Sequence, residues 1–265
     1  MVTNIWIHIL ALVCLFPAVA AGFKGGSERG TFVWAGFGLA AAVATAWSAV
    51  QMGPGWNAGF GAALWLTVAA TFVIFLVLSL VMTDIWRLGP LLAPYLVLLA
   101  IVAVIWSQVS AQSVSDAPSG WFGIHVALSI GTYVFLTLAA VAGAAVILQE
   151  RALKRRAPDR LTRSLPSLAD SETLEYRLLG AGEVILAAGI VTGMGAQYAT
   201  DGGLIELSHK TILTLAAFGV IAALLVARQA WGTRGRKAAR YVLIGYLLMT
   251  LAYPGVKFVT DVLIG

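Results

Sequence analysis

The stretch from Trp121 to Arg156 constrains the fold more than any other part of the chain. It opens with Trp-Phe-Gly-Ile-His, continues as an apolar run from Val126 to Leu148 and ends in a basic cluster at residues 154–156. A helix of about 27 residues, rising about 1.5 Å per residue, is long enough to cross a lipid bilayer. The sequence therefore predicts a transmembrane helix with an aromatic anchor at one end, a positive anchor at the other and His125 about one turn inside the aromatic end.

The composition extends this interpretation to the whole chain. Of its 265 residues, 60% are hydrophobic and only 11% are charged, and the mean hydropathy is +0.90. A soluble domain carries about a quarter charged residues. We therefore expect an all-α integral membrane protein whose residues 1–265 form one polytopic domain. The single cysteine, Cys14, excludes both a disulfide framework and a Cys-x-x-Cys-His site for covalent haem attachment.

Windows of about 20 apolar residues predict a bundle of eight transmembrane helices. They cover residues 4–22, 31–51, 62–82, 90–108, 121–148, 178–199, 206–227 and 241–263. We interpret the first as a retained helix and not a cleaved signal peptide, because no Lys or Arg precedes its apolar region.

The charges between these helices predict their orientation. Fifteen of the 17 basic residues fall in connections on one side, which the positive-inside rule assigns to the cytoplasm. The largest of these connections is a basic loop at residues 149–177, which we expect to anchor the topology and to contact lipid headgroups. Both termini are then predicted on the outer, periplasmic side. Basic residues beside membrane helices indicate topology and not nucleic acid binding.

Two histidines are predicted to lie at one depth near the outer face. The fifth helix runs inward from Trp121 and the seventh from about Glu206, so His125 and His209 each lie within roughly one turn of the outer surface. Two neutral imidazoles at one level of a bundle can supply both axial ligands of a b-type haem, or part of a metal site. The alternative is that each only caps or hydrogen-bonds neighbouring backbone.

Two lysines stand on the outer side, against the prevailing charge pattern. Lys210 follows His209, and Lys257 lies in the last predicted helix. Both could pair with the propionates of a haem or with another anionic ligand. For Lys257 the alternative is an i,i+4 pair with Asp261.

Three further features have a structural and a functional interpretation. His8 is a third candidate ligand or a packing residue, and the membrane-embedded Glu183 could be protonated, pair with Arg177 or relay protons. Gly189 and Gly193 form a Gly-x-x-x-Gly pair, which permits close approach of helices.

Several short segments of the C-terminal half, taken in order, resemble the cytochrome c assembly membrane proteins of the CcsA and CcmC type. The segments are Trp121–Val126 with Ser129 and Tyr133, Leu165–Leu168, Tyr176–Leu179, Thr192–Gly193, and Trp231–Ala239 leading into Gly245–Tyr246. In that family a tryptophan-rich outer loop, the WWD motif, presents haem between outer-facing histidines for export or for attachment to apocytochrome c.

The resemblance implies a role for individual residues. His125 matches the first outer histidine of the family, but the segment from Asp201 to Thr211 has no tryptophan and the usual second outer histidine is missing. This pattern is similar to the shorter, YpjD-like inner-membrane branch, in which His209 begins the helix after the absent motif. The missing motif argues against haem lyase activity, and we assign no enzymatic activity.

We therefore expect a multi-pass protein of the bacterial cytoplasmic (inner) membrane that holds haem b near the outer face. His125 and His209 would be the axial ligands, and Lys210 and Lys257 would neutralise the propionates. The predicted partners are haem, the lipid bilayer and other cytochrome c maturation or membrane proteins. The alternative is a transporter or transport-accessory subunit whose histidines bind a divalent cation or act as a pH switch.

Overall fold

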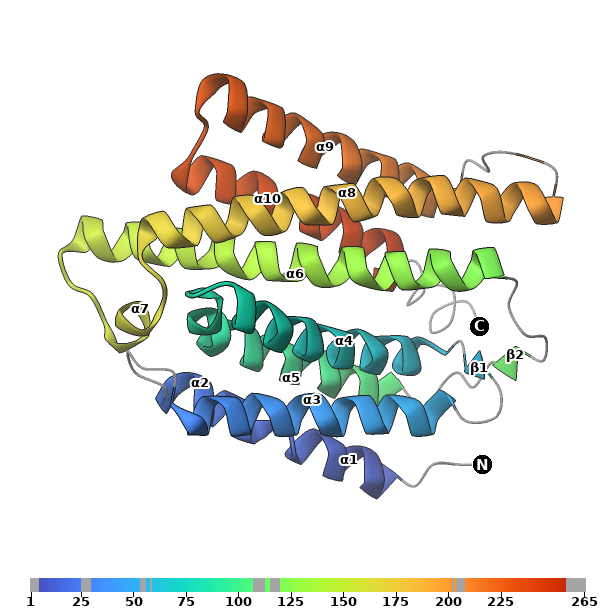
Figure 1. Ribbon diagram of the computed structural model, residues 1–265, viewed down its shortest axis with the longest axis horizontal. Helices are drawn as coiled ribbons and strands as arrows, with labels where there is room; N and C mark the ends of the chain where they lie inside the picture. The colour runs from blue at the N-terminus through green and yellow to red at the C-terminus, as the bar shows by residue number, and fades with distance from the viewer. Residues whose placement is uncertain are drawn as a thin grey trace. The chain divides into compact units, whose positions relative to one another are not determined.

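The computed structural model describes residues 5–24, 30–52, 56–57, 59–106, 113–114, 120–201, 203 and 208–255, and almost all of them are helical (Figure 1). The helices and strands in chain order are α1 Ile5–Val13, α2 Phe16–Lys24, α3 Thr31–Met52, β1 Trp56–Asn57, α4 Phe60–Val81, η1 Ile85–Leu88, α5 Gly89–Trp106, β2 Ser113–Val114, α6 Gly120–Arg155, α7 Arg160–Ser164, α8 Leu168–Asp201, α9 His209–Trp231, α10 Gly235–Thr250 and η2 Leu251–Gly255. The two short strands pair antiparallel with each other.

Seven helical stretches among the described residues are long and apolar enough to cross a membrane. They are Trp6–Lys24, Thr31–Met52, Phe60–Val81, Ile85–Trp106, Trp121–Arg155, Leu168–Tyr198 and His209–Trp231. The prediction of an all-α polytopic membrane protein is therefore confirmed. The predicted eighth helix, residues 241–263, begins within α10, but its residues 256–263 lie outside the described residues, and the orientation of the termini stays a prediction.

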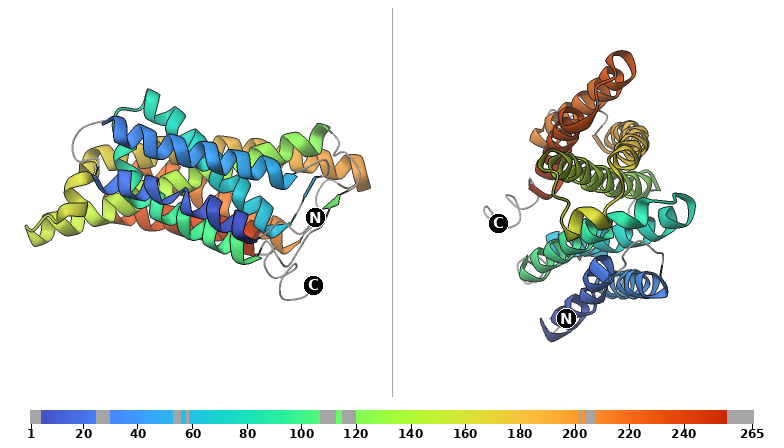
Figure 2. Two further views of the ribbon diagram at one scale, coloured as in Figure 1. Left: turned by 90° about the horizontal axis from the view of Figure 1, so that it is seen from below. Right: turned by 90° about the vertical axis from the view of Figure 1, so that its left-hand side faces the viewer.

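Contacts group the chain into two compact units. Unit 1 consists of residues 1–115, 151–167 and 258–265, and unit 2 of residues 116–150 and 168–257. That residues 1–265 form one transmembrane domain stays a prediction. In unit 1, α3 packs along α4, and α2 packs against α3 and α5. In unit 2, α9 and α10 lie side by side as an antiparallel hairpin (Figure 2).

The first predicted helix is interrupted. The structure ends α1 at Val13, forms a turn at Cys14 and Leu15 and begins α2 at Phe16. Pro17 gives the physical reason, because it has no amide hydrogen for the carbonyl four residues earlier and its ring clashes with that carbonyl. The apolar composition of the stretch does not predict this interruption of the helix.

The connection predicted at residues 149–177 is mostly helical. The α6 helix continues to Arg155, and α8 already begins at Leu168. Between them, Asp159 caps α7, since its Oδ1 accepts a hydrogen bond from the Thr162 amide at 2.8 Å. Hydrogen bonds from Thr162 also hold the pKa of Asp159 below its usual range. Hydropathy predicts which residues cross the membrane, but it does not predict the residues at which the helices begin and end.

Glycines allow α6 and α8 to approach closely and run antiparallel within unit 2. Neighbouring pairs along this contact are Trp121 with Gly195, His125 with Gly193, Leu128 with Gly189, Gly131 with Ile185, Leu136 with Gly182, and Gly143 with Glu175. The predicted close packing at the Gly-x-x-x-Gly pair is thus observed. It brings the backbone of α8 against the side chain of His125.

Candidate functional site

His125 lies in the second turn of α6 and is held by the backbone of α8. Its Nδ1 lies 2.9 Å from the carbonyl oxygen of Gly189. The Thr192 hydroxyl donates to the same carbonyl at 3.1 Å. A carbonyl oxygen only accepts hydrogen bonds, so Nδ1 must carry the proton in this contact. The lone pair of the neutral ring is then on Nε2, which makes no hydrogen bond within the described part of the chain.

Gly193 provides the space in which the His125 ring lies. A Cβ atom added at Gly193 would stand 2.9 Å from Cε1 of His125 and 3.1 Å from its Nδ1. The ring itself is half-buried. The imidazole is therefore fixed by one nitrogen and has one face against bare backbone, an arrangement that holds its other nitrogen available for a ligand.

The start of α9 carries the second predicted ligand. His209 is the first residue of this helix, and Ser208 caps the helix by accepting a hydrogen bond from the Thr211 amide at 3.3 Å. The side chains of His209 and Lys210 are exposed. The start of α9 follows the end of α8, the helix that carries Gly189 and Gly193, and the two helices pack against each other. The structure thus brings the start of α9 to the end of unit 2 that holds His125, while direct pairing of the two imidazoles stays a prediction.

We call this group the His125 end of unit 2. It consists of His125, Gly189, Gly193, His209 and Lys210. The fourth predicted cofactor-binding residue, Lys257, lies outside the described residues, as does Asp261, so neither the propionate contact nor the alternative ion pair is tested.

The third histidine lies in a different environment in unit 1. His8 is completely buried and meets the Trp47 ring edge-on, with 4.6 Å between the ring centroids and 84° between the planes. This contact has the geometry of a T-shaped aromatic pair. The structure therefore favours the packing interpretation of His8.

Glu183 is buried in the middle of α8. The residue is 8% exposed, and neither carboxyl oxygen has a hydrogen-bond partner among the described residues. The predicted pair with Arg177 does not form among the described residues, since Arg177 is exposed and Glu183 is buried.

A second polar group, which sequence reasoning missed, lies toward the opposite ends of the same helices. Arg228 of α9 forms an ion pair with the fully buried Glu175 of α8, with 2.8 Å between Nη1 and Oε2. Its Nη2 donates to the Glu172 carbonyl at 2.7 Å, and its guanidinium stacks on the Tyr176 ring at 5.1 Å from the centroid. The spacing of residues could have predicted the burial of Glu175, since Leu178 and Leu179 follow it by three and four positions and lie buried on the same helical face.

The turn between α9 and α10 completes this group. Gly232 and Gly235 adopt φ values of 65° and 66°, which favour glycine, and the Glu150 carboxylate accepts a hydrogen bond from the Arg236 amide at 3.1 Å. We call Glu150, Glu172, Glu175, Arg228 and Arg236 the Arg228 end of unit 2. The glycines and arginines of this segment, which contributed to the family resemblance, thus shape a tight turn and a helix cap.

Hydroxyl groups link α6 to α10 between the two ends. Tyr246 donates to the Tyr133 hydroxyl at 3.2 Å, and Thr137 donates to the Tyr246 hydroxyl at 3.2 Å. The centroids of the two tyrosine rings lie 5.6 Å apart.

Among the described residues, no three His, Cys, Asp or Glu side chains form a group that could hold a metal ion. At the His125 end, Nε2 of His125 makes no hydrogen bond among the described residues, and His209 and Lys210 stand at the start of α9.

Comparisons with known proteins show which family the chain resembles. The family model of the cytochrome C assembly protein matches residues 33–264. An uncharacterized 28.8 kDa protein from the nifR3-like 5' region of Azospirillum brasilense is 45% identical over 268 residues, which cover 99% of each chain. The cytochrome c biogenesis protein CcsA of Synechococcus sp. (strain CC9902) is 26% identical over 171 residues, which cover 57% of this chain and 56% of that protein. No solved structure matches the chain.

The family match covers most of the described helices of both units, including α6, α8 and the start of α9, which form the His125 end. The chain therefore belongs to the cytochrome c assembly protein family.

Proposed function

We propose that this protein binds a b-type haem at the His125 end of unit 2 and handles it during cytochrome c assembly. The observation that carries the proposal is the state of His125, whose Nδ1 is engaged by the Gly189 carbonyl while Nε2 is left without a hydrogen bond in the described structure. A histidine that ligates a metal commonly has its other ring nitrogen fixed in this way. Membership of the family relates the protein to cytochrome c biogenesis.

The residues of the His125 end fit a haem in three respects. Imidazole is a common axial ligand of haem iron, and this unit carries one histidine in the second turn of α6 and another at the first position of α9. The backbone at Gly193 gives the His125 ring room that any larger side chain would fill. Lys210 is exposed in the first turn of α9, next to His209, and could pair with a propionate.

Each residue then has a separate task. His125 would be one axial ligand, oriented through its bond to the α8 backbone, and the exposed His209 the other. Lys210 and Lys257 would neutralise the two propionates. A bound haem would supply a redox-active iron, or would itself be the cargo that is passed on. We place this site on the periplasmic side of the bacterial inner membrane, following the distribution of basic residues.

A reduced-minus-oxidised absorption spectrum tests the proposal. Protein purified in mild detergent, with and without added haem, is compared with the His125→Ala and His209→Ala variants. The buried His8 offers a matched control, because a His8→Phe variant keeps a ring against Trp47 and removes an imidazole from unit 1.

A low-spin spectrum that both His125→Ala and His209→Ala abolish, and that His8→Phe retains, is the expected result. A folded wild-type protein that takes up no haem would contradict the proposal. A spectrum lost only in His125→Ala would retain His125 as a ligand and remove His209 from the ligand pair.

A further inference from the structure

Thr192 of α8 binds the same carbonyl oxygen as His125. Its hydroxyl donates to the Ala188 carbonyl at 2.9 Å and to the Gly189 carbonyl at 3.1 Å. The Gly189 oxygen also lies 2.9 Å from Nδ1 of His125. One hydroxyl proton is therefore shared between two backbone acceptors, and one of these acceptors holds the imidazole.

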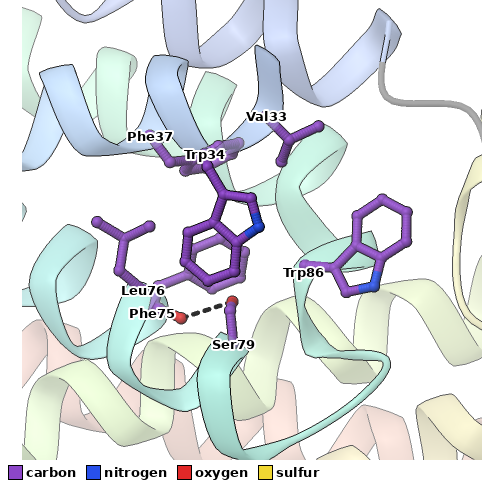
Figure 3. A pocket seen from close by; sticks show the side chains of 7 residues that line it. All are labelled: Val33, Trp34, Phe37, Phe75, Leu76, Ser79 and Trp86. Atoms are coloured by element: carbon purple, nitrogen blue, oxygen red, sulfur yellow. Dashed lines mark hydrogen bonds between the residues drawn. The ribbon is translucent and has the colours of Figure 1, made fainter. Parts of the chain in front are cut away.

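The bond from Thr192 to Gly189 differs from the usual hydroxyl bond within a helix. A Ser or Thr hydroxyl inside a helix commonly donates to the carbonyl four residues earlier. Figure 3 shows such a bond in unit 1, where the Ser79 hydroxyl donates to the Phe75 carbonyl at 2.7 Å. Thr173 of α8 makes a bond of the same kind, at 2.9 Å. The Gly189 carbonyl, in contrast, also accepts a proton from a side chain of another helix.

The Gly189 carbonyl has more donors than lone pairs. A carbonyl oxygen offers two lone pairs. Gly189 lies inside α8, so the hydrogen bonds of the helix backbone use one of them. The Thr192 hydroxyl and the His125 ring then compete for the remaining capacity. Because both donor hydrogens carry positive partial charges, they also repel each other, and each weakens the other's hydrogen bond.

The strength of the hydrogen bond at Nδ1 affects the other nitrogen of the ring. A hydrogen bond from one ring nitrogen of a histidine fixes its tautomer and makes the opposite nitrogen a more basic ligand. A donor that competes for the same acceptor reduces this gain in basicity. The hydroxyl of Thr192 thus acts on Nε2 of His125 through a single backbone oxygen, that of Gly189.

We propose that Thr192 is a positioning residue for His125, and that its hydroxyl limits the strength of the hydrogen bond between Nδ1 and the Gly189 carbonyl. The consequence for a bound haem rests on the proposed function, whereas the state of the Nδ1 proton is a property of the protein alone. Thr192 and Gly193 then have separate tasks. The hydroxyl of the first adjusts the bond that holds the ring, and the missing side chain of the second gives the ring its space.

Nuclear magnetic resonance of the haem-free protein tests this role. Protein with isotopically labelled histidine, in detergent micelles, gives signals of the ring N–H groups, and the His125 signal is the one that a His125→Ala variant lacks. Thr192→Val keeps the shape of the side chain and removes the hydroxyl, so the Nδ1 proton of His125 should move downfield as its hydrogen bond strengthens. Thr192→Ser keeps the hydroxyl and should give the wild-type signal.

Haem titration of the same variants measures the effect on the ligand. Thr192→Val should bind haem about twofold to fivefold more tightly, the lower part of the range for one neutral hydrogen bond. The midpoint potential of the bound haem should fall, because a more basic ligand stabilises ferric iron. Thr173→Val removes a hydroxyl of the same kind from α8, far along the helix from Gly189, and should change neither quantity.

The position of the His125 signal decides the outcome. A signal that stays in place or moves upfield in Thr192→Val, or that moves equally in Thr173→Val, would overturn the proposal, as would a wild-type ring proton on Nε2. If Thr192→Val does not fold, Thr192→Ala removes the same hydroxyl and should give the same downfield movement. A wild-type protein that binds no haem would contradict the proposed function, while the Nδ1 proton would still decide the role of Thr192.

Discussion

The two ends of unit 2 lie on the same helices but use polar side chains in opposite ways. At the Arg228 end, a fully buried carboxylate meets a guanidinium whose exposed fraction is 9%, and that guanidinium also binds a carbonyl and an aromatic ring. At the His125 end, one imidazole is fixed through a single nitrogen, while His209 and Lys210 are exposed. The first end satisfies its charges internally and so contributes to stability, whereas Nε2 of His125 makes no hydrogen bond among the described residues, which is why we propose ligand binding at the second end.

Removing Arg228 should give the largest effect on stability. Arg228→Met leaves the buried Glu175 without its counter-ion, which typically costs about 3–5 kcal/mol. Thermal unfolding in detergent, followed by circular dichroism, measures the loss. Any folded Arg228→Met protein should still bind haem, and the double variant Glu175→Leu with Arg228→Met should regain much of the lost stability. An Arg228→Met protein that loses haem binding without losing stability would contradict the different roles of the two ends.

Gly193→Ala should have the next largest effect, and it should act on binding. The added methyl group would stand 2.9 Å from Cε1 of His125, so the ring must move away from its position. Displacing a fixed ligand in this way commonly lowers affinity by about 10–100-fold. Haem titration followed by absorption measures it.

A glycine of the same helix serves as the control for this substitution. A Cβ atom at Gly180 meets no neighbour within 4 Å, so Gly180→Ala should leave the haem affinity unchanged. Equal affinities of the Gly180→Ala and Gly193→Ala proteins would mean that the His125 ring is not the ligand that Gly193 accommodates.

Glu150→Gln should weaken the Arg228 end by about 0.3–1 kcal/mol, the usual contribution of a negative charge near the N-terminus of a helix. The change removes the charge that faces the first turn of α10, while the amide side chain keeps an accepting oxygen. Hydrogen exchange of the first-turn amides of α10 should quicken, and the haem spectrum should not change. Unaltered exchange would show that the Arg236 amide does not depend on Glu150.

Lys210→Gln should have the smallest effect. An exposed charged pair contributes only about 0.2–1 kcal/mol, so we expect haem affinity to fall by no more than about fivefold. The difference between wild type and variant should shrink as salt is added, because salt screens exposed charges. A salt-independent difference would point to a structural role for Lys210.

Particular residues show where sequence reasoning reached its limit. The apolar run after His125 predicted α6, since burial in a membrane depends on local composition. The pairing of Arg228 with Glu175 joins residues 53 positions apart, and neither residue has a local pattern that names its partner. The Gly-x-x-x-Gly pair predicted close packing, but only the register of α6 against α8 placed His125 over Gly193. Pro17 was visible in the sequence, yet hydropathy alone ran the first helix through it.

The sequence by itself determined that this chain is an all-α, multi-pass membrane protein of the cytochrome c assembly family, and it singled out His125. These properties follow from local composition and from short motifs, which need no knowledge of distant contacts. Only the tertiary structure decided that Nδ1 of His125 meets the Gly189 carbonyl and that Arg228 forms an ion pair with Glu175. Each of these depends on the register of one helix against another, and many contacts spread along the chain set that register together.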